Sequence, residues 1–295
     1  MKKIAVIGGG ITGITTAYAL AKKGYSVTLF ERHRYAAMET SFANGGQLSA
    51  SNAEVWTHYS TILKGLKWML KSDAPLLLNP KPSWHKISWF AEFMLSMKDY
   101  QRNTVETARL AVAARQHLFA WAHEERIDFD LKKQGILHIY RDKKGFDHAG
   151  KVSAMLAKGG LPRHAVTPEE MKAIEPTLAG NYYGGYFTES DSTGDIHKFT
   201  TGLALAAQRL GVRTLYDQDV TSVSSNNQTA TIKVSHSDAP PTVHTFDGVV
   251  ICAGVASKKF AAELGDRVNI YPVKGYSITV NLNDQDSQQG APQVS

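Results

Sequence analysis

A glycine-rich turn near the N-terminus is the first group of residues whose spacing points to chemistry. Gly8, Gly10 and Gly13 match the pattern G-x-G-x-x-G. The first glycine permits a tight turn, the second lets a pyrophosphate approach the backbone, and the third lets a helix pack closely against a strand. The free N–H groups at the start of that helix favour phosphate. The turn therefore predicts a dinucleotide site, formed by Gly8, Gly9, Gly10, Ile11, Thr12 and Gly13.

The elements around this turn have the order that such a site needs. Residues 4–7 are typical of a short buried strand, residues 12–23 have the apolar spacing of a helix, and residues 27–31 read as a second strand. Right-handed crossover makes the two strands parallel and adjacent. Glu31 ends the second strand, where a carboxylate accepts hydrogen bonds from a ribose diol. Because this carboxylate would repel a 2′-phosphate, NADP is disfavoured despite the neighbouring Arg32.

A second segment that could do chemistry covers residues 39–47. Its side chains are mostly small or polar, and it contains two adjacent glycines. It lies within a long predicted loop, 35–55, in which apolar residues do not recur at helix or strand spacing. Such a segment lets main-chain N–H groups press against a flat ring. The glycine turn alone does not distinguish FAD from NAD, and this segment favours FAD. The alternative is an ordinary solvent-exposed loop.

Composition indicates a globular chain and excludes several classes of function. The chain has 295 residues, of which 43% are hydrophobic and 20% charged, and this length is typical of about two domains. The single cysteine, Cys252, excludes an intrachain disulfide, and no secretory signal follows Met1, so we expect a cytoplasmic location. No apolar run reaches the ~18 residues of a membrane span. The net charge of +6 is scattered, which argues against nucleic acid as a partner but allows an anionic substrate or membrane surface.

The middle of the chain has a different pattern from its two ends, where βα elements of the nucleotide-binding type occur. This order predicts an α/β fold with a Rossmann-like, discontinuous cofactor domain over 1–85 and 190–260, and an interleaved α+β substrate domain over 86–189 and 261–295. The predicted helices are 59–71, 86–99, 103–124, 145–158 and 197–210, with a capping box at Thr167–Glu170. The predicted strands are 135–140, 182–187, 212–215, 219–223, 230–235, 242–246, 249–252 and 276–280.

Three motifs together resemble a known family. They are the glycine turn, the Ser41-x-Ala43-Asn44-Gly45-Gly46 segment, and the run from Ser192 to Phe199. Over essentially all 295 residues, the sequence is similar to the D-amino acid oxidase-type FAD-dependent oxidoreductases. Within that family it is closest to the bacterial D-amino acid dehydrogenases (the small, FAD-carrying subunit). The resemblance implies oxidative deamination of D-amino acids to 2-oxo acids and ammonia by hydride transfer from Cα to flavin N5.

The resemblance also implies which residues bind FAD. The ADP half is expected on the glycine turn and Glu31, with Arg32 beside the adenosine. A backbone contact to the adenine is expected from Val220, and Ala253-Gly254 is expected to pass close to the FAD. Contacts to the flavin and pyrophosphate are expected from Ser41, Asn44, Gly45, Gly46 and Gln47.

The residues around the substrate are less defined by the sequence. His197 opens a predicted helix and is a candidate for the pocket, the alternative being a histidine bonded to Asp195. Tyr271, Lys274 and Tyr276 are further pocket candidates, with a structural role as the alternative. No catalytic side chain is assigned, because proximity of the substrate to the flavin is the main device of this reaction. No His, Cys or carboxylate spacing predicts a metal site.

The sequence departs from the family at its end. Family members continue beyond this point with a section that carries the arginine for the substrate carboxylate, and residues 281–295 do not match it. A truncated FAD-binding module without activity is therefore one alternative, and an FAD amine oxidase that uses O2 and glycine, sarcosine or a proline derivative is another.

The expected electron acceptor is a quinone or the respiratory chain. Peripheral contact with the inner face of the cytoplasmic membrane is compatible with two apolar helices, 62–70 and 87–97, and core packing of these helices is the alternative. The lysines near the two helices are Lys64, Lys67, Lys71 and Lys86.

Overall fold

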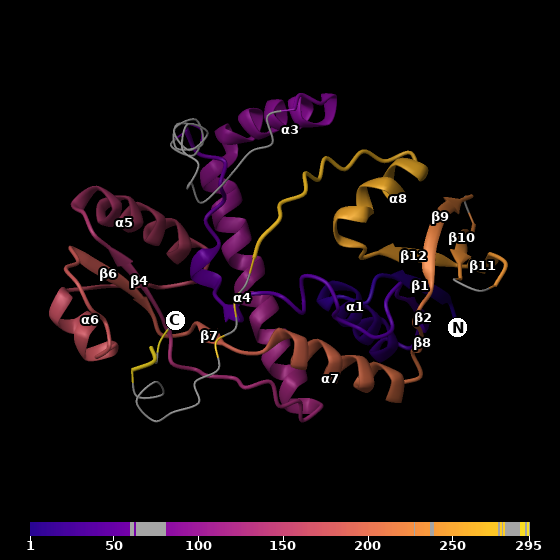
Figure 1. The fold of residues 1–295 in the computed structure, drawn as a ribbon, viewed down its shortest axis with the longest axis horizontal. Coiled ribbons are helices and arrows are strands. Elements are labelled where there is room, and N and C mark those ends of the chain that lie inside the picture. Colours follow the sequence, from indigo (N-terminus) through magenta and orange to yellow (C-terminus); the bar gives the residue numbers. More distant parts are fainter. Residues whose placement is uncertain are drawn as a thin grey trace. The chain divides into compact units, whose positions relative to one another are not determined.

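The computed structural model describes residues 1–59, 62, 81–226, 228–236, 239–276, 278, 280, 290–292 and 294 (Figure 1). The chain divides into two compact units, and each unit is assembled from stretches that are separated in sequence. Unit 1 consists of Met1–Gly46, Ala120–Asp130 and Asp195–Ile278. Unit 2 consists of Gln47–Phe119, Leu131–Gly194 and Thr279–Ser295.

A four-stranded parallel sheet forms the centre of unit 1. Its strands, in order across the sheet, are β12 (Gly248–Ile251), β1 (Lys3–Ile7), β2 (Ser26–Phe30) and β8 (Arg213–Leu215). The helix α1 (Ile11–Lys22) connects β1 to β2, and α7 (Ile196–Arg209) packs against α1. This arrangement confirms the predicted Rossmann-like fold. Ala5, Val6 and Ile7 of β1 are buried because both faces of a parallel sheet are covered.

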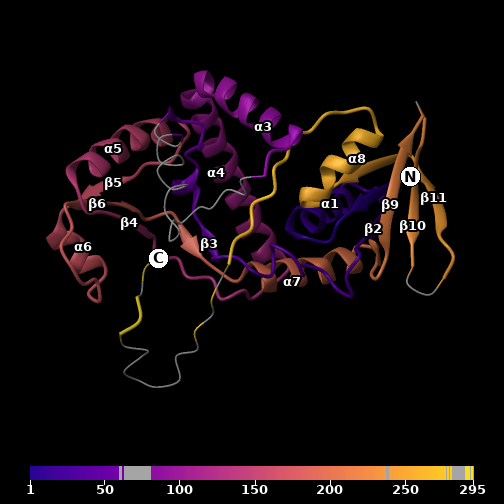
Figure 2. The ribbon, with the colours of Figure 1, turned by 45° about the horizontal axis from the view of Figure 1, so that its top comes forward.

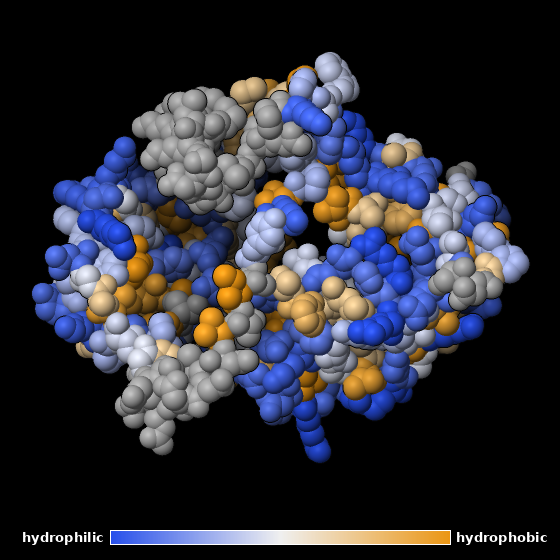
Figure 3. Space-filling view, viewed as in Figure 1, coloured by the Kyte–Doolittle hydropathy of each residue, from blue (hydrophilic) through white to orange (hydrophobic). Residues whose placement is uncertain are grey.

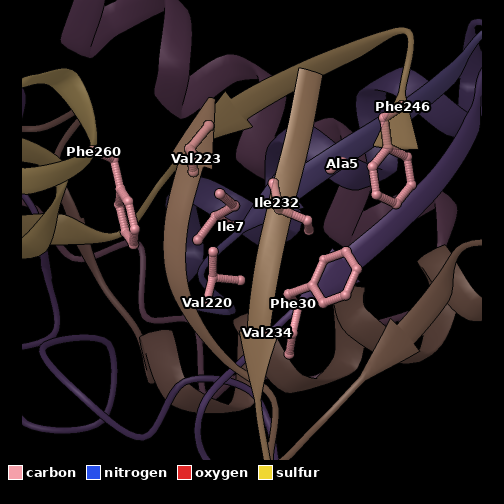
Figure 4. Packing of buried hydrophobic residues seen from close by; sticks show 9 residues of the cluster. All are labelled: Ala5, Ile7, Phe30, Val220, Val223, Ile232, Val234, Phe246 and Phe260. Atoms are coloured by element: carbon pink, nitrogen blue, oxygen red, sulfur yellow. The ribbon is translucent and has the colours of Figure 1, made fainter. Parts of the chain in front are cut away.

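An antiparallel sheet covers the face of the parallel sheet opposite α1 (Figures 1 and 2). It consists of β9 (Asp219–Ser225), β10 (Ala230–Ser235) and β11 (Thr242–Phe246), with β10 in the centre. The core between the sheets is shown in Figure 4, where Phe260 comes from α8 (Ser257–Glu263). The buried residues of this core are Ala5, Ile7, Phe30, Val220, Val223, Ile232, Val234, Phe246 and Phe260.

The long helix α4 (Tyr100–Glu124) begins in unit 2 and ends in unit 1. Polar contacts of Glu125, the residue directly after α4, attach this end of the helix to the two helices that pack on the parallel sheet. The Tyr18 hydroxyl donates to Glu125 Oε1 at 2.6 Å, and Arg209 Nη2 donates to Glu125 Oε2 at 2.8 Å. The hydrogen bond from Tyr18, together with the Arg209 guanidinium, lowers the pKa of Glu125 against the opposing effect of its burial. These contacts explain why residues 120–130 belong to unit 1.

Unit 2 is built on a three-stranded antiparallel sheet with β6 in the centre. The order is β4 (Ile136–Tyr140), β6 (Gly184–Thr188) and β5 (His164–Val166). Among the described residues of the unit, the α-helices besides α4 are α3 (Trp84–Leu95), α5 (Lys143–Lys158) and α6 (Pro168–Ile174). The predicted capping box of α6 is confirmed, because Thr167 and Glu170 bond reciprocally. Two short strands, β3 (Gln47–Leu48) and β7 (Ser192–Thr193), pair antiparallel.

Most predicted elements agree with the structure to within a few residues. The strand predicted over 276–280 is wrong for its described residues, because Tyr276, Ile278 and Val280 are 86%, 90% and 72% exposed and belong to no strand. The helix predicted over 59–71 lies almost entirely outside the described residues. The predicted domain boundaries stay a prediction, and the compact units divide the chain elsewhere, with 47–59 in unit 2 and 261–276 in unit 1. The visible surface is mostly hydrophilic, with apolar side chains in separate patches (Figure 3).

Candidate cofactor site

The glycine turn lies at the carboxyl end of β1, between the ends of its two neighbouring strands. Gly8 has a φ of +106°, and its N–H donates to the Phe30 carbonyl of β2 at 2.8 Å. A Cβ atom on Gly8 would lie 2.4 Å from the Cys252 carbonyl oxygen, and one on Gly13 would lie 1.8 Å from the Gly8 carbonyl oxygen. Both positions therefore require glycine for the fold itself.

Gly10 is different, because the fold does not need a glycine there. It precedes α1 in an extended conformation, and a Cβ atom on it would meet only the Ser41 hydroxyl, at 3.4 Å. The first turn of a helix has N–H groups without intrahelical partners. The Ile11 N–H donates to Ser41 Oγ at 2.9 Å, and the space above Gly10 stays open for a pyrophosphate. The absence of a side chain at this position fits a dinucleotide.

Glu31 stands beside this turn at the end of β2. Its side chain is buried, with the residue 7% exposed. Oε2 accepts a hydrogen bond from the Gly9 N–H at 2.5 Å, and Oε1 accepts one from the His33 N–H at 2.9 Å. The carboxylate is thus fixed against the glycine turn, where the sequence predicts a ribose contact.

Arg32 points toward a neighbouring loop residue. Its guanidinium forms an ion pair with Glu39, which also bonds to His33 Nε2 at 2.8 Å. The hydrogen bonds from His33 and Arg32 lower the pKa of Glu39, and the bond with Glu39 raises the pKa of Arg32. Arg32 therefore orders the start of the loop that leads to the second predicted segment, and its contact with the adenosine stays a prediction.

The loop Ser41–Gly46, which we call the flavin loop, is folded on its own Asn44. The Asn44 amide donates to the Ser41 carbonyl at 3.0 Å, and its oxygen accepts from the Gly46 N–H at 2.9 Å. Gly46 has a φ of +64°, a conformation that favours glycine. A Cβ atom on Gly45 would meet nothing within 4 Å, so this backbone borders open space. An open glycine backbone fits the flat ring of a flavin.

Two further predicted segments lie near the glycine turn. The Cys252 N–H donates to the Ile7 carbonyl at 2.8 Å, which places Ala253 and Gly254 beside Gly8. The chain before β9 bonds to the backbone of Glu31 through the Gln218 N–H, at 2.9 Å. Val220 follows two residues later, with its side chain in the core cluster.

Of the four residues predicted for the substrate pocket, the structure places His197 against the flavin loop and the other three in an irregular stretch after α8. The Asp195 side chain accepts from the Lys198 N–H and so caps α7, rather than bonding to the His197 ring. The His197 ring contacts Phe42 of the flavin loop edge-to-face at 5.0 Å between centroids, and its Nε2 is buried without a hydrogen-bond partner among the described residues. The other candidates, Tyr271, Lys274 and Tyr276, lie in an irregular stretch after α8, where the Lys274 ammonium lies 5.1 Å from the centre of the Tyr276 ring.

A buried carboxylate that the sequence did not point to, Asp191, binds the segment that follows the flavin loop. Asp191 is fully buried, and its two oxygens accept from the N–H groups of Ala50 and Ser51 at 3.2 and 3.1 Å. Arg115 of α4 forms an ion pair with it. No local pattern marks Asp191 in the sequence, because its partners are about 76 and 140 residues away along the chain.

A histidine of the sheet continues this polar cluster. His138 Nε2 lies 2.8 Å from the hydroxyl of Ser51. The pKa of His138 is lowered to about 4, chiefly by burial and also by the Arg163 guanidinium, whereas Asp191 opposes both effects. His138 is therefore neutral at pH 7. Within the described ranges, no group of three or more His, Cys, Asp or Glu side chains could hold a metal ion.

A parallel sheet with this glycine turn at the end of its central strand is typical of proteins that bind a dinucleotide cofactor. Comparison with known proteins identifies the family and the cofactor. Residues 3–294 match the model of the family described as FAD dependent oxidoreductase. The chain therefore belongs to the FAD dependent oxidoreductase family, and its cofactor is FAD, as predicted.

Individual relatives within and around this family show which proteins the chain resembles in sequence and in fold. The chain is 58% identical over 295 residues to D-amino acid dehydrogenase 3 of Mesorhizobium japonicum, covering all of this chain and 71% of that protein. It is 38% identical to D-amino acid dehydrogenase of Paramagnetospirillum magneticum, covering 99% of this chain and 69% of that protein. Among solved structures, glycine oxidase from Geobacillus kaustophilus has a TM-score of 0.65 at 19% identity, over 90% of this chain and 59% of that one. At that identity the likeness shows the fold alone.

Two glycine variants separate the requirements of the fold from those of the cofactor. We expect Gly10→Ala to fold like the wild type, because its Cβ meets only Ser41 Oγ, but to bind FAD about tenfold or more weakly. We expect Gly13→Ala to lower the free energy of unfolding by about 1–3 kcal/mol or more, with or without FAD. Urea denaturation and FAD titration of the apoprotein measure the two effects. Unchanged FAD affinity in Gly10→Ala would contradict a pyrophosphate at this turn.

The buried His138 makes stability depend on pH. The His138 imidazole takes up a proton near pH 6.5 in the unfolded chain but only near pH 4 in the folded chain. The neutral, buried imidazole therefore makes its full contribution to the free energy of unfolding above pH 6.5. This contribution is lost as the pH falls toward 4. We expect the thermal midpoint of His138→Gln to fall less between pH 7 and pH 4.5 than that of the wild type. His164→Gln, at an exposed histidine on β5, the opposite edge strand of the same sheet, is the control and should behave as the wild type.

Proposed function

We propose that this chain binds FAD across the glycine turn and the flavin loop and oxidises D-amino acids. The observation that carries the proposal is the open space above Gly10, beside the fixed Glu31 carboxylate, in a chain 58% identical to a D-amino acid dehydrogenase. The substrate loses a hydride from Cα and a proton from its amine to become an imine. Water then converts the imine to a 2-oxo acid and ammonia.

Each part of the site has its own task in holding the cofactor. The turn from Gly8 to Gly13 binds the pyrophosphate at the N-terminus of α1, and the Glu31 carboxylate accepts hydrogen bonds from the ribose hydroxyl groups. Gly45 and Gly46 offer backbone to the ring, and Ala253-Gly254 lines the other side of the turn. The bound FAD supplies the acceptor for the hydride. The protein contributes orientation, and we assign no side-chain base.

Two alternatives remain as outcomes of the same test. One is an FAD amine oxidase that uses O2 and glycine, sarcosine or a proline derivative, and the 19% identity to a glycine oxidase structure gives this alternative only a shared fold. The other is an FAD-binding module without activity. The relatives at 58% and 38% identity, both D-amino acid dehydrogenases, favour the dehydrogenase.

Reduction of the bound flavin tests the activity. We expect anaerobic D-alanine to bleach the visible flavin band of the purified chain, and L-alanine to leave it unchanged. We expect Glu31→Gln to bind FAD about tenfold more weakly, because a neutral amide accepts the ribose hydroxyls less strongly. A yellow protein that no D-amino acid bleaches would identify the inactive module. Rapid reoxidation by O2, with turnover of glycine or sarcosine, would identify the oxidase.

We further propose that the electrons pass to a quinone or another respiratory-chain acceptor, and that α3 contacts an anionic membrane surface. Its outward-facing residues form one apolar stripe that includes Trp84, Ile87 and Met94, which are 82%, 52% and 54% exposed. The exposed Lys98 follows the helix. Such a stripe beside a cation suits the interface of anionic lipids. Within the described ranges, no helix combines the length and hydropathy of a membrane span.

One of the predicted lysines takes no part in this surface. The Lys86 side chain is buried and donates to the Lys81 carbonyl, so it points away from solvent. Lys64, Lys67 and Lys71, and the helix 62–70 apart from residue 62, lie outside the described residues. The proposed contact therefore depends on α3.

Flotation with lipid vesicles tests the membrane contact. We expect the protein to float with vesicles that contain phosphatidylglycerol, less so with pure phosphatidylcholine, and less as salt is raised. The double variant Ile87→Glu/Met94→Glu should stay in solution, because it places two charges on the apolar stripe. Val243→Glu, at a 65% exposed valine of β11, is the matched control and should float as the wild type. Equal flotation of all three proteins would refute a contact through α3.

A further inference from the structure

The flavin loop is the stretch in which the chain first leaves unit 1 and enters unit 2. Unit 1 includes Gly46, and unit 2 begins at Gln47. At the start of the loop, the Ser41 hydroxyl accepts a hydrogen bond from the Ile11 N–H of α1, at 2.9 Å. The end of the loop leads directly to residues 47–51, in which the N–H groups of Ala50 and Ser51 donate to the Asp191 carboxylate. The loop is therefore anchored at both ends, by different parts of the protein.

The second anchor is stronger than the first. The Asp191 carboxylate accepts hydrogen bonds from the main-chain N–H groups of Ala50 and Ser51, and it forms an ion pair with Arg115. Arg115 also donates to the Ser190 hydroxyl at 3.0 Å, which orients its guanidinium. A carboxylate that is fully buried needs such partners, because an unpaired charge in the interior is very unfavourable. Charge-assisted hydrogen bonds of this kind are roughly twice as strong as neutral ones.

Two other contacts hold the same few residues. The strand β3 pairs with β7, with Gln47 opposite Thr193 and Leu48 opposite Ser192. The Ser51 hydroxyl bonds to His138 of β4. Every residue from 47 to 51 except Ser49 thus has a partner in β4, β7 or the turn before β7, and Asp191 contributes a buried charge to these contacts.

We propose that Asp191 is a positioning residue for the bound flavin. It fixes the backbone directly after the flavin loop, so that the Gly45–Gly46 backbone meets the flavin ring in one conformation. This inference rests on the proposed function, in which the flavin loop contacts the ring. Asp191 acts through residues 50 and 51, and it is not a catalytic residue.

The competing explanation is that Asp191 stabilises only the fold of unit 2. Replacing Asp191 alone would leave Arg115 without its carboxylate and could unfold the protein. The informative comparison is therefore between Arg115→Gln, which keeps the carboxylate on the two N–H groups, and the double variant Asp191→Asn/Arg115→Gln, which removes it without leaving an unpaired cation. Glu175→Gln is the matched control. Glu175 is a buried carboxylate of unit 2 that accepts from the Thr177 N–H at 3.1 Å.

The first measurement uses the apoprotein, without any flavin. We expect hydrogen exchange of the peptide covering residues 47–53 to be at least tenfold faster in the double variant than in Arg115→Gln or Glu175→Gln. Exchange of the β1 and β2 peptides should be equal in all proteins. This result would show that Asp191 holds the segment locally.

The second measurement titrates FAD into the same proteins. We expect the double variant to bind FAD about tenfold more weakly than Arg115→Gln, and to show a shifted visible band and less quenching of flavin fluorescence. Glu175→Gln and Arg115→Gln should have the wild-type spectrum. A double variant with faster exchange at 47–53 but the wild-type flavin spectrum and affinity would overturn the inference and leave the proposed function standing. Wild-type protein that binds no FAD would overturn both.

Discussion

The close approach of α1 to β1 is the constraint on which the rest of unit 1 depends. A Cβ atom on Gly13 would lie 1.8 Å from the Gly8 carbonyl oxygen, so the helix can start where it does only without a side chain at that position. This approach aims the N-terminus of α1 at the edge where β1, β2 and β12 end. Glu31 and Ala253 arrive at that edge because their strands pair in parallel with β1. The site is thus a consequence of strand order, and it lies where open parallel sheets bind their ligands.

The structure assigns different reasons to glycines that look equivalent in the motif. Gly8 and Gly13 serve the packing of the strand and helix, and a side chain at either would collide with backbone even without a ligand. Gly10 serves only what binds above it. Fold and cofactor thus require the same three-glycine pattern for separable physical reasons. A protein of this class can lose its cofactor by a change that leaves its sheet intact.

Local patterns predicted what depends on local structure. The β1–α1–β2 unit, the capping box at Thr167 and the short strands of residues 219–246 were predictable because periodicity and turn residues determine them. The pairing of β3 with β7 was not, because strands of two residues have no period. Asp191, Ala50 and Arg115 come from three distant stretches, and only the folded chain reveals their contact. The strand predicted over 276–280 failed because apolar alternation alone does not supply a neighbouring strand to bond with.

The sheet order of unit 1 also has a consequence for how the protein is made. The central strand β1 ends at Ile7, but its partner β12 begins only at Gly248. At a synthesis rate of roughly 5–20 residues per second, β1 waits on the order of 10–50 s for that partner to leave the ribosome. Throughout this time β1 has β2 along one edge, and the N–H and C=O groups of its other edge lack their strand partner. An unpaired strand edge is prone to aggregation, and slow stretches of translation before residue 248 would lengthen this exposure.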